Sequence, residues 1–221
     1  GFTPVVSTSM GKKEKDLSEV VKIPPLKLAR ILHARALPLL GLMHKLKGDA
    51  YHGYGNAFFF VGVGSNIPAK GYISPKTTIE AAIKAFDAFG ITLVKISKFY
   101  ITSPVPSSDQ PWFVNCVVQV STKLHPNDCM GALLQIETIF ERERSVPNAR
   151  RTLDLDLLDY MGLITSHQDP LILPHPRMNN RAFVLMPLSD ICADWVCPKG
   201  GRKIGELIEE LPDDQIINCL I

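Results

Sequence analysis

Two aspartates alternate with leucines directly after a cationic segment, in the run Arg150-Arg151-Thr152-Leu153-Asp154-Leu155-Asp156-Leu157-Leu158. Apolar residues at every second position predict a β-strand. Side chains at i and i+2 of a strand share a face, so Asp154 and Asp156 would lie on one side and the leucines on the other. Two carboxylates beside arginines suit magnesium that also contacts phosphate oxygens. The alternative is a solvated strand face whose acids serve solubility.

Four arginines surround the start of this strand: Arg142, Arg144, Arg150 and Arg151. Guanidinium groups stay charged and bind phosphate oxygens through paired hydrogen bonds. The residues between them suit a loop that could close over a triphosphate and exclude water. A solvated helix end is the alternative, because cations also suit a helix C-terminus. No GxxxxGK[ST] motif is present, and the run that starts at Gly62 lacks the third glycine of GxGxxG, so a nucleotide would be bound by other means.

Two further segments could recognise a flat ligand. In residues 99–115, Phe113 and Asn115 would share one face of a strand. An aromatic face and an amide provide the stacking and edge hydrogen bonds that a heteroaromatic ligand requires. Residues 174–183 carry one His, two Arg, two Asn and a Phe, which is typical of a substrate loop. Core packing and turn formation are the alternative roles for these side chains.

Apolar periodicity predicts the elements that position these residues. Helices are expected over 77–89 and 126–143, and strands over 58–63, 91–101, 113–122 and the run containing the two aspartates. The order β-α-β-β-α-β is typical of an α+β protein with a ferredoxin-like sandwich, in which helices pack on an antiparallel sheet.

The charge of the chain is unevenly distributed. Residues 1–57 carry nine Lys and Arg against four Asp and Glu, whereas residues 58–221 carry fifteen against eighteen. We therefore predict a basic extension over 1–56 and one folded domain over 57–221. The basic, apolar stretch 24–47 could bind a membrane surface or a partner, or simply pack on its own domain.

The cysteines and the hydropathy indicate a cellular compartment. Five scattered cysteines without paired spacing predict neither a disulfide framework nor a zinc site, so we expect a reducing, cytoplasmic environment. No apolar run reaches the roughly 18 residues that a membrane span requires. We expect a monomer that acts on small molecules and binds no nucleic acid.

Four segments together resemble the 6-hydroxymethyl-7,8-dihydropterin pyrophosphokinase family: VGVGSN, FYITSPVPSSDQPWFVN, RTLDLDLL and LPHPRMNNRAFVLMPL. They occur in the order of that family between Phe58 and Leu188. The resemblance implies a ferredoxin-like αβα sandwich. It also implies transfer of pyrophosphate from ATP to the hydroxymethyl group of the dihydropterin in folate biosynthesis, with release of AMP.

The resemblance also assigns residues. Two Mg²⁺ ions, with ATP as co-substrate, would be held by Asp154 and Asp156. The pterin would be stacked by Phe113 and Phe183, and its edge bound by Asn115, Thr102, Ser103 and Val105. ATP would be contacted by Glu137, Leu157, His175 and Arg181. Besides the two aspartates, the catalytic residues would be Arg142, Arg144 and Arg151.

Two hypotheses from other classes stay open. A non-catalytic ferredoxin-like sensor predicts loss of the acid pair, yet Asp154 and Asp156 are both present. A module that binds RNA through aromatics on its sheet predicts a basic domain, whereas residues 58–221 carry a net charge of −3.

Overall fold

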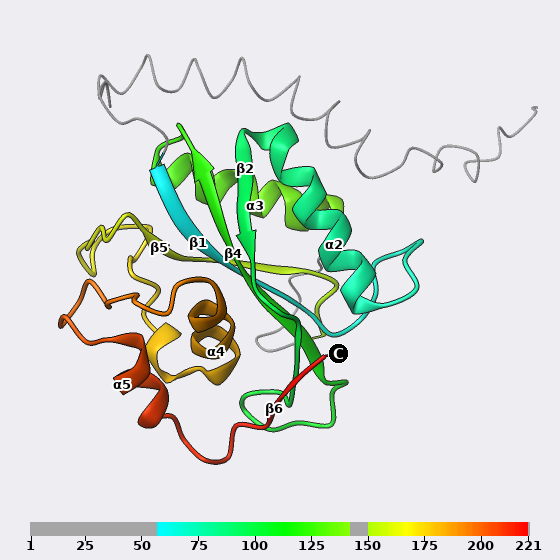
Figure 1. Cartoon of the computed structure of the whole chain (residues 1–221). Coiled ribbons are helices and arrows are strands. Elements are labelled where there is room, and N and C mark those ends of the chain that lie inside the picture. The colour runs from blue at the N-terminus through cyan, green and yellow to red at the C-terminus, as the bar shows by residue number, and fades with distance from the viewer. Residues whose placement is uncertain (1–56, 142–149, 221) are drawn as a thin grey trace, which may run out of the picture.

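The computed structural model describes residues 57–141 and 150–220 (Figure 1). The predicted extension over residues 1–56 lies outside this range, as do Arg142 and Arg144. The regular elements follow one another as β1 (Ala57–Ser65), α2 (Pro75–Ala85), β2 (Ile91–Ile96), β3 (Tyr100–Thr102), β4 (Phe113–Thr122), α3 (Pro126–Ile139), β5 (Asp154–Tyr160), α4 (Ala182–Ile191), α5 (Ile204–Glu209) and β6 (Ile217–Cys219). Single 3-10 turns occupy Phe86–Phe89 and Met178–Asn180.

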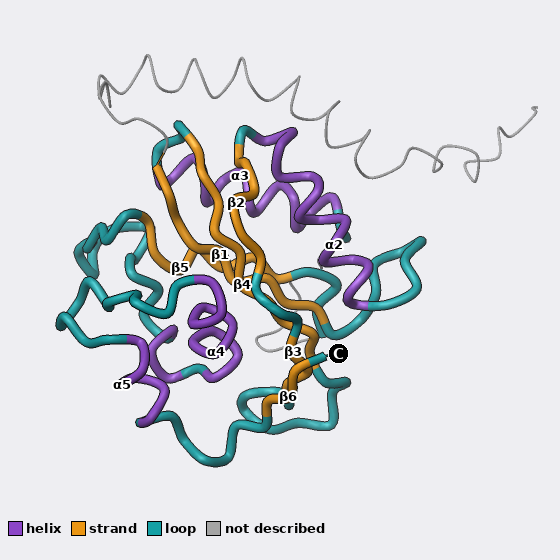
Figure 2. The backbone as a smooth tube through the Cα atoms, in the orientation of Figure 1, coloured by secondary structure: helices purple, strands orange, loops and turns teal. Residues whose placement is uncertain are grey.

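Every hydrogen-bonded pair of neighbouring strands is antiparallel, and the order across the sheet is β5-β1-β4-β3-β6. Strand β2 also pairs with β4, so β2 and β3 occupy successive stretches of the same β4 edge. Counting these two as one strand gives the ferredoxin-like order, with β6 added outside β3 (Figure 2). The predicted fold class is confirmed.

The strand predicted over 91–101 is wrong in one respect, because it is interrupted between Ile96 and Tyr100. Ser97 Oγ accepts a hydrogen bond from the Val117 N–H at 2.9 Å, and the Ser97 N–H donates to the Val117 carbonyl at 3.0 Å. The serine hydroxyl thus takes the place of a ladder carbonyl. Alternating hydrophobicity does not predict where a side chain replaces a backbone group in the sheet, because it describes which face each side chain occupies and not which backbone groups pair.

The sheet is covered on both faces (Figure 1). Alternate β1 residues, among them Phe59 and Val61, pack in one core with helices α2 and α3. The neighbouring residue Phe60 belongs to a second core that includes side chains of α4 and α5. The leucines at 153, 155 and 157 all lie in the first core. The predicted separation of leucines and aspartates onto opposite faces of β5 is therefore confirmed.

Local sequence explains how α2 begins and ends. Ser74 forms a capping box with Thr77, and Pro75 occupies the first helical turn, where its missing N–H costs nothing. The chain leaves the following 3-10 turn at Gly90, whose φ of 74° suits glycine. Within the described ranges, no helix is long and apolar enough to cross a membrane.

Candidate active site

The centre of the site is a row of three residues across neighbouring strands. Gly64 on β1 pairs with Asn115 on β4 and with Asp154 on β5. Since paired strands lie about 4.8 Å apart, Asn115 and Asp154 are separated by roughly 10 Å across the sheet. A Cβ at Gly64 would lie 2.6 Å from Asn115 Oδ1. The absence of a side chain at position 64 therefore keeps the floor of the pocket open.

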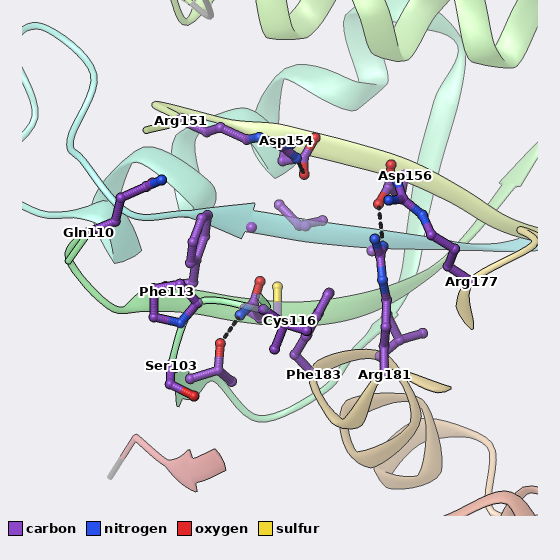
Figure 3. Close-up of a pocket in the computed structure, with 18 of the residues that line it drawn as sticks. Ser103, Gln110, Phe113, Cys116, Arg151, Asp154, Asp156, Arg177, Arg181 and Phe183 are labelled. Carbon is purple, nitrogen blue, oxygen red and sulfur yellow. Dashed lines mark hydrogen bonds and ion pairs between the residues drawn. The ribbon is translucent and has the colours of Figure 1, made fainter. Parts of the chain in front are cut away.

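The predicted acid pair lies at one end of this pocket (Figure 3). Asp154 forms an ion pair with Arg151, and Arg181 Nη1 lies 3.6 Å from Asp156 Oδ2. Burial, and then repulsion from Asp154, raise the pKa of Asp156 above its ordinary value, against the opposing charges of His175 and Arg181. Burial and the neighbouring carboxylate together thus disfavour the ionised form of Asp156 more than the nearby cations favour it, and a bound divalent cation would relieve this cost.

His175 lies beside this pair. Its Nδ1 accepts a hydrogen bond from the Arg177 N–H at 3.2 Å, so a neutral ring carries its proton on Nε2. Burial, and then the positive charges of Arg181 and Arg177, lower the pKa of His175, although Asp156 acts in the opposite direction. The geometry thus favours a neutral imidazole among the charged groups.

Two phenylalanines line the other end of the pocket: Phe113 from β4 and Phe183 from α4 (Figure 3). The guanidinium of Arg181 lies over the ring of Phe183, 5.2 Å from its centroid. Asn115 Nδ2 donates to Thr102 Oγ1 at 2.7 Å, which fixes the amide beside the aromatic slot. The predicted residues Thr102, Ser103 and Val105 also line the pocket. This end can stack a flat ring and bind its polar edge.

Three of the four residues predicted to contact ATP are not in the pocket lining: His175, described above, and Glu137 and Leu157. Glu137 on α3 is buried, and its Oε1 accepts from the Leu155 N–H at 2.8 Å. Leu157 is buried in the core beneath the sheet. The structure does not bring either side chain to the pocket lining, and their contact with ATP stays a prediction. The predicted roles of Glu137 and Leu157 came from their positions relative to the family motifs. Such positions do not distinguish a residue that contacts ATP from one that packs against or hydrogen-bonds to the strand.

The sequence analysis missed Asn66 and Gln110 as site residues. Gln110 lines the pocket, and its Oε1 accepts from Asn66 Nδ2 at 3.1 Å. In the sequence, Asn66 follows Gly64-Ser65 and is typical of a simple turn. Its side-chain partners lie 44, 45 and 85 positions away, so no local pattern could have identified them.

Fold and site together define an α+β protein of ferredoxin-like architecture, with an aromatic slot that leads to a paired-carboxylate, arginine-lined centre on one sheet face. A family model described as 7,8-dihydro-6-hydroxymethylpterin-pyrophosphokinase (HPPK) matches residues 60–193. The chain belongs to this family.

Individual relatives agree with this assignment. The 2-amino-4-hydroxy-6-hydroxymethyldihydropteridine pyrophosphokinase of Pseudomonas aeruginosa is 39% identical over 158 residues, which cover 71% of this chain and 93% of that protein. The folic acid synthesis protein fol1 of Pneumocystis carinii is 35% identical over 161 residues, which cover 73% of this chain and 21% of the relative. The chain thus spans most of the bacterial protein but about a fifth of the fungal one.

A solved structure shows the same fold. A Plasmodium falciparum HPPK-DHPS chain superposes with a TM-score of 0.55 at 13% sequence identity, over 72% of this chain and 45% of that chain. At this identity the likeness concerns the fold alone.

Proposed function

We propose that the protein transfers pyrophosphate from ATP to the hydroxymethyl group of 6-hydroxymethyl-7,8-dihydropterin, releasing AMP, as a step of folate biosynthesis. The observation that carries this proposal is one pocket that holds both the Phe113–Phe183 slot and the Asp154–Asp156 pair. The first fits a flat pterin, and the second fits the metal-bound phosphates of a nucleotide. The names of the relatives and family membership support the reaction.

Magnesium fits the donor set. Asp154 and Asp156 provide hard oxygen ligands on one strand face, and the Asp156 side chain keeps 33% of its surface exposed. In the described part of the chain, no group of three or more His, Cys, Asp or Glu could hold a metal ion. Two ions held by these carboxylates would therefore take their other ligands from phosphates and water. Bound magnesium would supply charge neutralisation on the transferred group.

Arg151 and Arg181 have a complementary role in this proposal. Each pairs with one aspartate, and each would be available to a phosphate oxygen once cations occupy the acid pair. Transfer of a phosphoryl-type group requires positioning and charge stabilisation rather than a protein nucleophile. Removal of one such cation is expected to reduce turnover by about 10²-fold.

Phe113, Phe183 and Asn115 would orient the acceptor. With the ring stacked between the two phenylalanines and its edge toward Asn115, the hydroxymethyl group would extend across Gly64 toward Asp154. The separation of roughly 10 Å between Asn115 and Asp154 is about the length of a bicyclic ring with a one-carbon substituent and its attached oxygen. Positioning of this kind can account for a large part of the rate enhancement.

We further propose that one chain suffices for activity in the cytoplasm. The cytoplasmic location rests on the scattered cysteine spacing, and Cys116, Cys129 and Cys197 are buried free thiols in the described region.

The decisive experiment measures AMP released from ATP and Mg²⁺, with and without the dihydropterin. AMP should form only when the pterin is present, and Asp154→Ala should abolish it while preserving the circular dichroism spectrum. Asp213→Ala, which changes an exposed aspartate far along the chain, serves as the matched control. Binding of pterin or ATP without AMP release would instead support a sensor.

A further inference from the structure

Helix α4, which carries Phe183, has no cap of its own. The first N–H groups of any helix need acceptors outside the helix, and a Ser, Thr, Asp or Asn at the N-cap usually provides one. In α4 the N-cap residue is Arg181, whose side chain makes no capping hydrogen bond. That side chain is directed instead toward Asp156 and the ring of Phe183 (Figure 3).

The missing acceptor comes from the C-terminal part of the chain. Gln215 Oε1 accepts from the Ala182 N–H at 2.9 Å, across 33 residues of sequence. Gln215 Nε2 donates to the Asn180 carbonyl, also at 2.9 Å. One side-chain amide therefore holds the backbone on both sides of Arg181, immediately before Phe183.

The residues that follow Gln215 hold the opposite wall of the pocket. The Ser103 N–H donates to the Ile216 carbonyl at 3.1 Å, and Ile217 pairs with Thr102 where β6 lies beside β3 (Figure 2). Both Thr102 and Ser103 line the pocket. A short arm, residues 215–219, thus bridges the α4 wall and the β3 wall. This arm lies beyond the residues that the family model matches.

We infer that Gln215 acts as a remote N-cap of α4 and that the 215–219 arm sets the width of the aromatic slot. Because Gln215 provides the capping acceptor, residue 181 need not be a capping residue and can be an arginine that serves the reaction. Gln215 is a positioning residue, since it does not line the pocket. The effect on the pterin rests on the function proposed above, whereas the capping role does not. An amide at 215 fixes Phe183 before a ligand arrives, which lowers the entropic cost of binding.

The test compares Gln215→Ala, Gln215→Asn and Asp214→Ala in the full chain. The first removes both hydrogen bonds, and the second keeps the amide but is one carbon too short to make both. The third changes the exposed neighbour. The Kd of 6-hydroxymethyl-7,8-dihydropterin would be measured by fluorescence, and the Kd of a non-hydrolysable ATP analogue with Mg²⁺ by calorimetry. Amide hydrogen exchange of residues 182–185 would be followed without ligand.

Loss of one helix cap corresponds to about a fivefold change in an equilibrium constant. Gln215→Ala and Gln215→Asn should therefore raise the pterin Kd about fivefold, leave the ATP-analogue Kd within about twofold, and speed exchange at Ala182. Asp214→Ala should change none of these. Should Gln215→Ala fail to fold, Gln215→Asn decides alone.

Two outcomes would overturn the inference: unchanged exchange at Ala182 in both Gln215 variants, or an equal loss of pterin affinity in Asp214→Ala. Wild-type protein that binds no dihydropterin would refute the proposed function instead. In that case the exchange of Ala182 still decides the capping role.

Discussion

Asn66 and Arg151 hold each other through reciprocal hydrogen bonds. The Asn66 N–H donates to the Arg151 carbonyl at 3.0 Å, and Asn66 Oδ1 accepts from the Arg151 N–H at 2.7 Å. The other end of the same amide donates to Gln110 Oε1 and to the Pro111 carbonyl. This buried side chain therefore joins the segment that carries the Arg151–Asp154 pair to the loop before Phe113.

Asn66→Asp should weaken pterin binding selectively. The substitution retains an acceptor for the Arg151 N–H but removes both donors to the 103–112 loop. A net hydrogen bond is worth about 0.5–1.5 kcal/mol, so the KM for pterin should rise by roughly 3- to 10-fold with a smaller change in the KM for ATP. Asn66→Ala loses the Arg151 contact as well and should also lower kcat. Steady-state kinetics with each substrate varied in turn would test this. Equal values of kcat and of both KM in Asn66→Asp and Asn66→Ala would contradict the prediction.

Asp156→Asn should stabilise the metal-free protein at neutral pH. Because the folded state raises the pKa of Asp156, its contribution to stability is complete at low pH and is lost as pH rises through the folded pKa. Asparagine cannot ionise, so the variant should melt above wild type at pH 7 in EDTA. The difference should disappear below about pH 4, where the carboxyl is neutral in both folded and unfolded chains.

Added Mg²⁺ and an ATP analogue should reverse this order, because ligands that bind only the native state raise its stability. Wild type should gain in melting temperature, whereas Asp156→Asn should gain little and show turnover reduced by at least about 10²-fold. A lower melting temperature of the variant in EDTA would show that the attraction of ionised Asp156 to His175 and Arg181 outweighs its burial and the repulsion from Asp154.

Gly64→Ala should close the floor of the slot. The new Cβ would lie 2.6 Å from Asn115 Oδ1, so the amide must move and break its hydrogen bond to Thr102. We expect the pterin Kd to rise by about 10-fold or more, since at least one buried hydrogen bond is lost together with space for the ligand.

Gly62→Ala is the matched control, because Gly62 lies on the same strand and also lines the pocket, where it pairs with Asp156. Its Cβ would meet Leu158 at 3.5–3.7 Å, which is ordinary van der Waals contact. In pterin titrations, Gly64→Ala should therefore bind clearly more weakly than Gly62→Ala. Equal affinities would show that Asn115 can move away from the new Cβ without weakening pterin binding.

Phe113→Ala should weaken pterin binding more than ATP binding. Loss of one stacking face removes both buried area and aromatic contact, which together are worth about 2–4 kcal/mol. Phe58→Ala changes a 51% exposed phenylalanine on the same sheet and should leave both affinities unchanged. Isothermal titration of each variant with pterin and with ATP would measure both affinities. Equal losses of affinity for pterin and ATP in Phe113→Ala would argue against stacking on Phe113.

Much of the fold follows from local pattern. Alternation along β5 determined that Asp154 and Asp156 share a face, because neighbouring strand residues point in opposite directions. The helical spacing of Ile79, Ala82 and Ile83 likewise predicted a helix over 77–89, and all three residues lie in the core on α2. The break at Ser97 was not predictable in this way, because it depends on a hydrogen bond to Val117 from another strand.

The sequence by itself determined the types of groups at the site: two acids separated by one leucine, cations beside them, aromatics and an amide. Only the tertiary structure decided which of them meet. Gly64 aligns Asn115 with Asp154 through strand register, and Asn66 and Gln215 fix the walls through partners more than 30 residues away. The physical reason is that periodicity encodes the direction of a side chain along its own element. Contacts between elements depend on register and packing, which no short segment specifies.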